Sequence, residues 1–111
     1  MSWAKRQRKK RFNNFVMVPR KILKLDEWRN LSPSAKILYV HLKAKYNGSN
    51  NGSIDLHYSE LKGIRGLSSH STISKALKEL LDKDWIKKTR FGGLYRYSNK
   101  YELTGRFDDY I

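Results

Sequence analysis

The chain has 111 residues and is 39% hydrophobic, which suffices for one small packed domain with tails and excludes a second core. Lysine and arginine number 24 against 10 acidic residues, so the formal net charge is +14, and a polyanionic partner would relieve the self-repulsion. The absence of cysteine excludes disulfides and thiolate zinc sites.

Long apolar segments are also missing from the sequence. No window approaches the ~18 consecutive apolar residues of a transmembrane helix. No apolar run follows the basic start, as a secretory signal would require. Nucleic acid is therefore the first candidate for the partner and an anionic membrane surface the second, and we expect a cytoplasmic or nuclear location.

Residues 1–14, MSWAKRQRKKRFNN, form a basic segment without any acidic residue. Because like charges this close together resist compaction, we expect a disordered basic arm in the free protein. Such an arm can follow phosphates or enter a minor groove. A solubilising tail, a nuclear localisation patch and a loose membrane contact are the alternatives. The candidates for phosphate contact are Lys5, Arg6, Arg8, Lys9, Lys10 and Arg11.

An apolar lead-in follows the arm. Residues 15–19, FVMVP, are predicted to be extended, because the residue before a proline avoids the helical conformation. Pro19 is placed to begin a short helical turn, PRKIL, and Asp26 a second turn that presents Trp28. We expect these pieces to wrap the core.

The first long helix is predicted to start at Ser32-Pro33, a hydroxyl N-cap followed by proline at the first helical position, and to run to about Tyr46. It is apolar on two faces, so we expect burial on two sides. One side would meet the helix at 69–83. The other would meet the lead-in or a second subunit, and the lead-in is preferred because an uncovered apolar face favours aggregation. The faces are Ala35, Leu38, Tyr39, Leu42 and Tyr46, and opposite them Ile37, Val40 and Ala44.

The middle of the chain predicts a short strand and a short helix. A turn-rich connector at 47–53, NGSNNGS, leads to a strand at 54–56. A short helix is expected from Tyr58 to about Lys62, and a turn with two glycines at 63–66 follows. A short helix, a tight turn and a longer helix form the helix-turn-helix arrangement.

The stretch 68–83, SSHSTISKALKELLDK, has the clearest helical pattern in the chain. At about 100° per residue its apolar side chains fall on one stripe. Ser68 or Ser69 can cap the start, and Glu79 with Lys83 forms a supporting i,i+4 pair. The stripe comprises Ile73, Ala76, Leu77, Leu80 and Leu81, and the polar side comprises Ser71, Ser74, Lys75 and Lys78.

The polar side of this helix suits a DNA major groove. Near its start it carries small hydroxyls, one histidine and lysines, and the helix has no carboxylate before Glu79. Small donors can approach base edges, and lysines can neutralise phosphates. Any solvated helix face also carries serine and lysine, so this pattern by itself leaves both interpretations open.

A β-hairpin is predicted after this helix. Residues 85–91 alternate basic with apolar or β-branched side chains as a strand does, and a second strand around 99–104 returns. The loop at 91–98 is long and rich in tyrosine and arginine, which is typical of a functional loop. The C-terminal tail, 105–111, is acidic and aromatic, and it either docks on the core or begins a linker.

The sequence lacks the signals of an enzyme or a metal site. The three histidines, His41, His57 and His70, lie on different predicted elements without metal-ligand spacing. The acidic residues show no pairing for acid–base chemistry, and no glycine-rich phosphate loop precedes a helix. We therefore predict no catalytic activity, cofactor, metal or small-molecule ligand.

The order of elements from about Phe15 to Thr104 resembles the winged helix-turn-helix fold: three main helices, short lead-in helices, a short strand and a two-stranded wing. The segment LSSHSTISKALKELLDKDWIKKTRFGG is similar to the recognition helix and wing of that family, whose frequent form is T-[VI]-S-[RK]-A-L, then E-L and G-[LFW]-I. Asp84 replaces the usual glycine, so we expect a less tightly turned helix end. FVMVP, LSPSAKILY and YNGSNNG resemble winged-helix domains of phage and plasmid replication proteins.

The resemblance implies an α+β domain over 15–104 that binds specific double-stranded DNA, with helix 69–83 in the major groove. The protein would be a prokaryotic or phage transcriptional regulator, or the DNA-binding part of a replication protein, associated with the nucleoid. A homodimer remains open. Ser69 has an alternative role as a cap only, His70 in local hydrogen bonds and Tyr97 in wing packing. The implied groove contacts are Ser69, His70, Ser71, Ser74, Lys75 and Lys78, and the implied wing contacts are Arg90, Arg96 and Tyr97.

A second function from another class fits the same scaffold. The aromatic side chains expected in the wing could stack on unpaired bases. The alternative is therefore an RNA-binding or single-strand-binding module, or a protein-interaction module, in which the arm supplies nonspecific charge.

Overall fold

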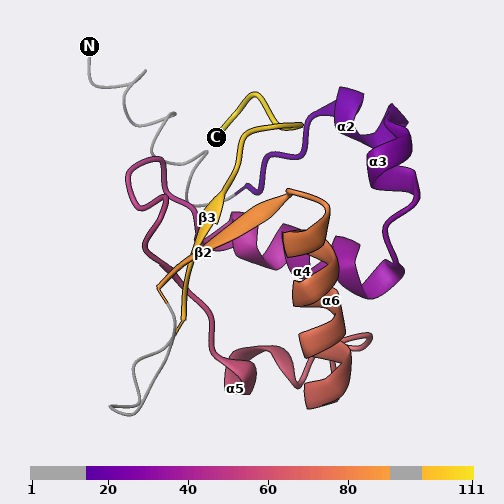
Figure 1. The fold of residues 1–111 in the computed structure, drawn as a ribbon, viewed down its shortest axis with the longest axis vertical. Coiled ribbons are helices and arrows are strands. Elements are labelled where there is room, and N and C mark those ends of the chain that lie inside the picture. Colours follow the sequence, from indigo (N-terminus) through magenta and orange to yellow (C-terminus); the bar gives the residue numbers. More distant parts are fainter. Residues whose placement is uncertain (1–14, 91–98) are drawn as a thin grey trace.

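A small sheet lies at one side of the helices in the structure, a computed structural model that describes residues 15–90 and 99–111 (Figure 1). The predicted arm and the hairpin loop lie outside these ranges. The α+β class is confirmed, and none of the described helices has the length and apolar character needed to cross a bilayer. The elements are α2 Arg20–Lys24, α3 Asp26–Arg29, α4 Pro33–Lys45, β1 Ile54–Asp55, α5 Tyr58–Leu61, α6 His70–Asp82, β2 Ile86–Arg90 and β3 Lys100–Leu103.

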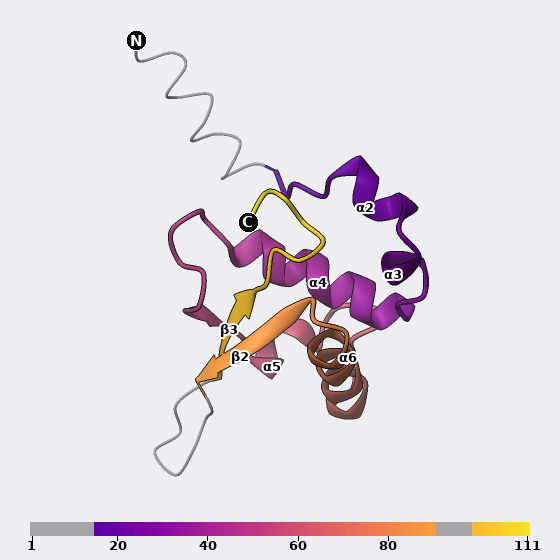
Figure 2. The same cartoon turned by 45° about the horizontal axis from the view of Figure 1, so that its top comes forward.

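The three strands form one antiparallel sheet in the order β1-β3-β2 (Figure 2). In this register Ile54 lies opposite Tyr101, and Ile86 lies opposite Leu103. All four side chains are buried. The sheet therefore contributes one apolar face to the core, and the returning strand predicted around 99–104 is confirmed as β3.

The start of α4 matches its sequence signal. The Ser32 hydroxyl accepts a hydrogen bond from the Ala35 N–H at 3.2 Å, and Pro33 occupies the first helical position. A carboxylate oxygen of Glu79, on α6, accepts from the Ser32 N–H at 2.8 Å. The side chain and the backbone of Ser32 thus both take part in the cap of α4. The bond from the Ser32 N–H to Glu79 also connects α4 to α6.

The two faces of α4 are covered differently from the prediction. The first face is buried as expected and packs against α6. Trp28 of the lead-in also meets this face, edge-on to Tyr39 at 5.8 Å between ring centroids. The second face is only partly covered. Ile37 contacts the turn at Gly66, whereas Ala44 is exposed, which costs little because its side chain is a single methyl group.

The FVMVP segment forms no helix or strand, its Pro19 has extended backbone angles, and, contrary to expectation, the segment does not cover the core. Phe15, Val16 and Met17 are all exposed. Pro19 is the N-cap of α2, which begins one residue later than predicted. Trp28 on α3 is the part of the lead-in that reaches the core, together with Ile22 on α2.

The C-terminal tail docks on the core, which the sequence left undecided. The Phe107 ring lies against Trp85, with ring centroids 4.5 Å apart. Trp85 also contacts Tyr39 at 5.2 Å and Trp28 at 5.6 Å, both in edge-on geometry. Aromatic pairs of this kind stabilise a core beyond their buried area. The tail therefore completes a cluster that joins α3, α4 and the start of β2.

A buried ion pair fastens the tail to α4. Lys43 and Asp108 are 4% and 2% exposed, and the Lys43 ammonium donates to the Asp108 carboxylate. The Tyr39 hydroxyl donates to the same carboxylate at 3.0 Å, and the Tyr110 N–H donates to its other oxygen at 3.0 Å. Burial, and then the Asp108 charge, raise the pKa of Tyr39, so its hydroxyl remains a donor.

Asp108→Ala should destabilise the protein by about 3–5 kcal/mol, because it leaves the Lys43 ammonium buried without a counter-charge. Urea denaturation followed by circular dichroism measures the change. Asp109→Ala is the matched control, since that carboxylate pairs with exposed Lys21, and it should have little effect. Equal effects of the two variants would show that the buried pair does not secure the tail.

The end of α6 is turned as tightly as a glycine would allow, against the expectation from Asp84. Asp84 adopts a left-handed conformation with φ +63°. Its N–H donates to the Leu81 carbonyl at 3.2 Å, and the Trp85 N–H donates to the Leu80 carbonyl at 2.9 Å. This is the Schellman arrangement, which aspartate can adopt at a cost. The turn directs Trp85 into the aromatic cluster.

Asp84→Gly should be more stable than Asp84→Ala by about 1 kcal/mol, because glycine adopts a positive φ without the Cβ clash. Both variants lose the same ion pair with Arg106, so their difference isolates the backbone conformation. Thermal and urea unfolding of the two variants provide the measurement. Equal stabilities would contradict a left-handed residue at this position.

Candidate nucleic-acid interface

The α6 helix is positioned by its cap and its apolar stripe. The Ser69 hydroxyl accepts from the Thr72 N–H at 3.1 Å and shares a second hydrogen bond with the Thr72 hydroxyl at 2.7 Å. The predicted cap is confirmed, and so is the Glu79–Lys83 pair, at 3.7 Å. Four residues of the predicted stripe, Ile73, Ala76, Leu77 and Leu80, are buried, and Leu81 is half-buried.

The opposite side of α6 is exposed and cationic. Because Glu79 points to the start of α4, the acidic residue on the outer side of this helix is Asp82, near its end. Asp82 pairs with Lys78 at 3.3 Å, and both side chains remain mostly exposed. The Lys75 side chain makes no hydrogen bond or ion pair with the described residues. Of the six predicted contacts on this helix, Ser69, His70, Ser71, Lys75 and Lys78 are exposed, and Ser74 is half-buried.

The short helix α5 lies against the first half of α6 through Tyr58. The Tyr58 ring stacks on the His70 imidazole, with 3.9 Å between centroids and an angle of 27°. The Tyr58 hydroxyl is 3.4 Å from the Ser74 hydroxyl. His70 and Ser74 therefore have a partner within the protein, as Ser69 and Lys78 do, and both still border the exposed side of α6.

The turn between α5 and α6 adds cations that the sequence analysis missed. Lys62 and Arg65 are exposed in this turn, directly before the candidate helix. The turn is fixed by Gly66, which has φ +97° and whose carbonyl accepts from the Ser34 hydroxyl at 2.8 Å. The sequence signal is the motif KGIRG at 62–66, which has two cations in the glycine-containing turn before the helix but does not show which way they point.

The predicted hairpin contacts lie where side chains are not described, and the described part of the hairpin adds one exposed cation. Lys87 is exposed on β2 and was not among the predicted contacts. Arg90 ends β2, and its side chain is not described. Arg96 and Tyr97, like the arm residues 5–11, lie outside the described residues, so their contacts stay predictions.

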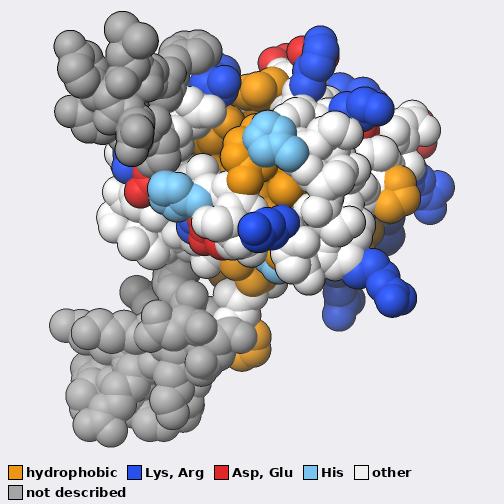
Figure 3. Space-filling view, turned by 90° about the horizontal axis from the view of Figure 1, so that it is seen from below, with side chains coloured by type: hydrophobic (Ala, Val, Ile, Leu, Met, Phe, Trp, Pro, Cys, Tyr) orange, Lys and Arg blue, Asp and Glu red, His pale blue; other side chains and the backbone are white. Residues whose placement is uncertain are grey.

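Positive charge dominates the surface around α6. Figure 3 shows several lysine and arginine side chains on the face seen from below, with few acidic ones among them. The exposed cations on α6 and in the segments next to it in the chain are Lys62, Arg65, Lys75, Lys78 and Lys83. Seven of the ten acidic residues pair with described lysines or arginines. Few carboxylates are thus left to oppose the cation surplus, and the surface is suited to an anion.

Gly66→Ala should destabilise the protein by about 1–2 kcal/mol, because alanine strains a left-handed residue. Its Cβ would also lie 2.9 Å from the Ile37 Cδ1. Gly63→Ala is the matched control: a Cβ there meets nothing within 4 Å, and the change should leave stability unchanged or raise it by up to about 1 kcal/mol. Urea titration of both variants is the measurement, and equal losses would contradict the described turn.

Groups that could hold a metal ion do not assemble within residues 15–90 and 99–111. His41 lies on α4, His57 before α5 and His70 on α6, and each is exposed. Comparison of the chain with protein-family models, with curated proteins and with solved structures gives no match.

Proposed function

We propose that the protein binds specific sequences of double-stranded DNA as a winged helix-turn-helix protein, with α6 in the major groove. The observation that carries the proposal is the exposed side of α6, where serine hydroxyls and lysines lie together and Lys75 has no partner among the described residues. A helix with side chains is about 10–12 Å across, and the major groove is about 12 Å wide. The buried stripe of α6 leaves this side facing outward.

The order of the elements supports the same proposal. A helix, a short strand, a helix, a turn and a second helix precede two strands, and β3 pairs with both β1 and β2. In a winged helix this arrangement sets the hairpin beside the recognition helix. The loop 91–98 is then the wing, with Arg90, Arg96 and Tyr97 as its contacts to backbone or minor groove.

The charged and the short side chains would have different tasks. Ser71 and Ser74 are short enough for α6 to approach base edges closely. Lys62, Arg65 and Lys78 flank them and would contact phosphates, which position the protein without selecting a sequence. The basic arm would add further phosphate contacts. A prokaryotic or phage regulator or replication protein, bound to DNA in the cytoplasm, fits this division of tasks.

Lys75→Ala should lower discrimination between the preferred duplex and a scrambled one by about 1–3 kcal/mol, because a base contact is lost. Lys24→Ala is the matched control: it removes the same charge from the exposed end of α2 and should weaken both duplexes slightly and alike. Fluorescence anisotropy with a duplex selected from a random pool is the measurement. If both variants changed binding uniformly, α6 would not be the recognition helix.

Salt titration provides an independent check on the phosphate contacts. With roughly six to ten of them, affinity should fall by about three to five decades between 50 and 200 mM salt. Removal of residues 1–11 should weaken binding to all duplexes alike and lower the salt slope. Stronger binding to single strands or structured RNA than to any duplex would instead support the alternative function.

A further inference from the structure

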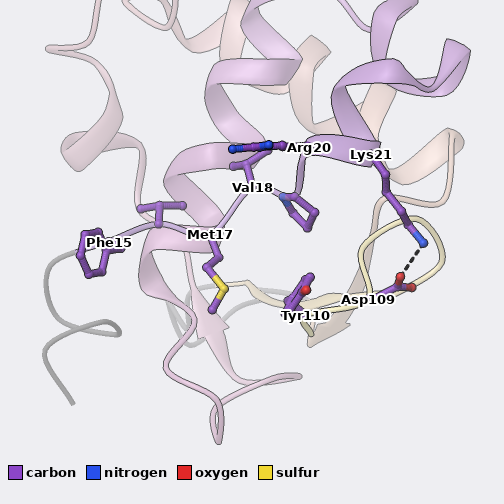
Figure 4. A pocket seen from close by; sticks show the side chains of 9 residues that line it. Phe15, Met17, Val18, Arg20, Lys21, Asp109 and Tyr110 are labelled. Atoms are coloured by element: carbon purple, nitrogen blue, oxygen red, sulfur yellow. Dashed lines mark hydrogen bonds and ion pairs between the residues drawn. The ribbon is translucent and has the colours of Figure 1, made fainter. Parts of the chain in front are cut away.

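An apolar groove lies between the lead-in and the C-terminal tail (Figure 4). Its volume is about 800 Å³, and residues 15–21 line it together with Asp109 and Tyr110. Met17 and Tyr110 lie on opposite sides of it, and the ion pair of Lys21 with Asp109 closes one end.

The groove gathers nearly all the large apolar side chains that the described residues expose. Four of the five, Phe15, Val16, Met17 and Tyr110, line it, and the fifth is Leu23. Phe15 is 62% exposed and Tyr110 is 59% exposed. Single exposed apolar residues are ordinary on a protein surface, but a contiguous patch indicates a binding site.

The backbone of the lead-in is also available. Residues 15–18 belong to no helix or strand, and their N–H groups make no backbone hydrogen bond within the described residues. A segment with unpaired N–H and C=O groups can pair with an extended chain. The groove thus offers apolar contacts and main-chain hydrogen bonds together.

The position of the groove argues against a second copy as its occupant. The lead-in and the C-terminus lie at one end of the molecule, and α5 with the first turn of α6 lies at the other (Figures 1 and 2). A two-fold axis through the groove would therefore turn the two α6 surfaces away from each other, not onto one duplex. Two chains of formal charge +14 would also repel each other there.

We propose that the groove docks a segment of another protein in which apolar residues are flanked by acidic ones. The exposed side chain of Arg20 is part of the lining, and Lys24, also exposed, follows it by one turn of α2. The two acidic residues of the neighbouring tail already have cationic partners: Asp109 pairs with Lys21, and Asp108 pairs with Lys43. Carboxylates of the partner would pair with Arg20 and Lys24, while its apolar side chains fill the groove. DNA bound to α6 would leave this end of the molecule accessible.

A short synthetic peptide with a Leu-Phe-Leu core and paired glutamates on both sides is the probe. Titrated into the full chain and followed by fluorescence anisotropy, it should bind, and peptides with lysine flanks or a serine core should bind at least about tenfold more weakly. Met17→Ser and Tyr110→Ser should each weaken the acidic peptide by about tenfold. Leu23→Ser is the matched control, an exposed apolar residue outside the groove, and should leave binding unchanged.

Several results would overturn the docking proposal. One such result is that the acidic peptide fails to bind. Another is that it binds the groove variants as tightly as the wild type, which would show that it binds cations outside the groove. Sedimentation could show a dimer that Tyr110→Ser abolishes, which would make a second copy the occupant. Binding to anionic lipid vesicles that Met17→Ser abolishes would point to a membrane. Because Met17 and Tyr110 are remote from α6, the DNA affinity of Met17→Ser and Tyr110→Ser should equal that of the wild type. This control shows that both variants are folded.

Discussion

The contact between α4 and α6 is the constraint on which the rest of the structure depends. The apolar stripe of α6 packs on α4, and the hydrogen bond from Ser32 to Glu79 fixes the start of one helix to the side of the other. Rotation of α6 about its axis would expose the stripe and bury lysines, both of which are costly. The same packing that stabilises the core therefore determines which side of α6 remains available to a ligand.

Local signals in the sequence were enough to place most elements. The caps at Ser32 and Ser69 were predictable because a hydroxyl at a helix start satisfies free N–H groups whatever the tertiary fold. The left-handed turn at Asp84 was not predictable, because aspartate adopts it only where the surrounding structure requires it. The partner of Lys43 was equally hidden, since Asp108 lies 65 residues away in the chain and both residue types are usually exposed.

The residues of the candidate surface could be predicted on α6, where helical periodicity applies, but not outside this helix. The polar side of α6 follows from helical spacing, which places Ser71, Lys75 and Lys78 on one side. Lys62 and Arg65 lie in a turn without helical periodicity, so the sequence alone does not show which way their side chains point. The stacking of Tyr58 on His70 depends on the angle between two helices, which is a tertiary property.

The buried pair of Lys43 and Asp108 also affects the groove beside the C-terminal tail. Asp108 precedes the two tail residues that line the groove, so the charge that anchors the tail also shapes a wall of that groove. Because Asp108 also accepts from the Tyr110 N–H, the tail is anchored next to the groove before any ligand arrives, which lowers the entropy cost of ordering the protein on binding. Proteolytic trimming that removed Asp108 would dismantle the wall and leave an ammonium group stranded in the interior, so shape at that surface and folding stability would be lost together.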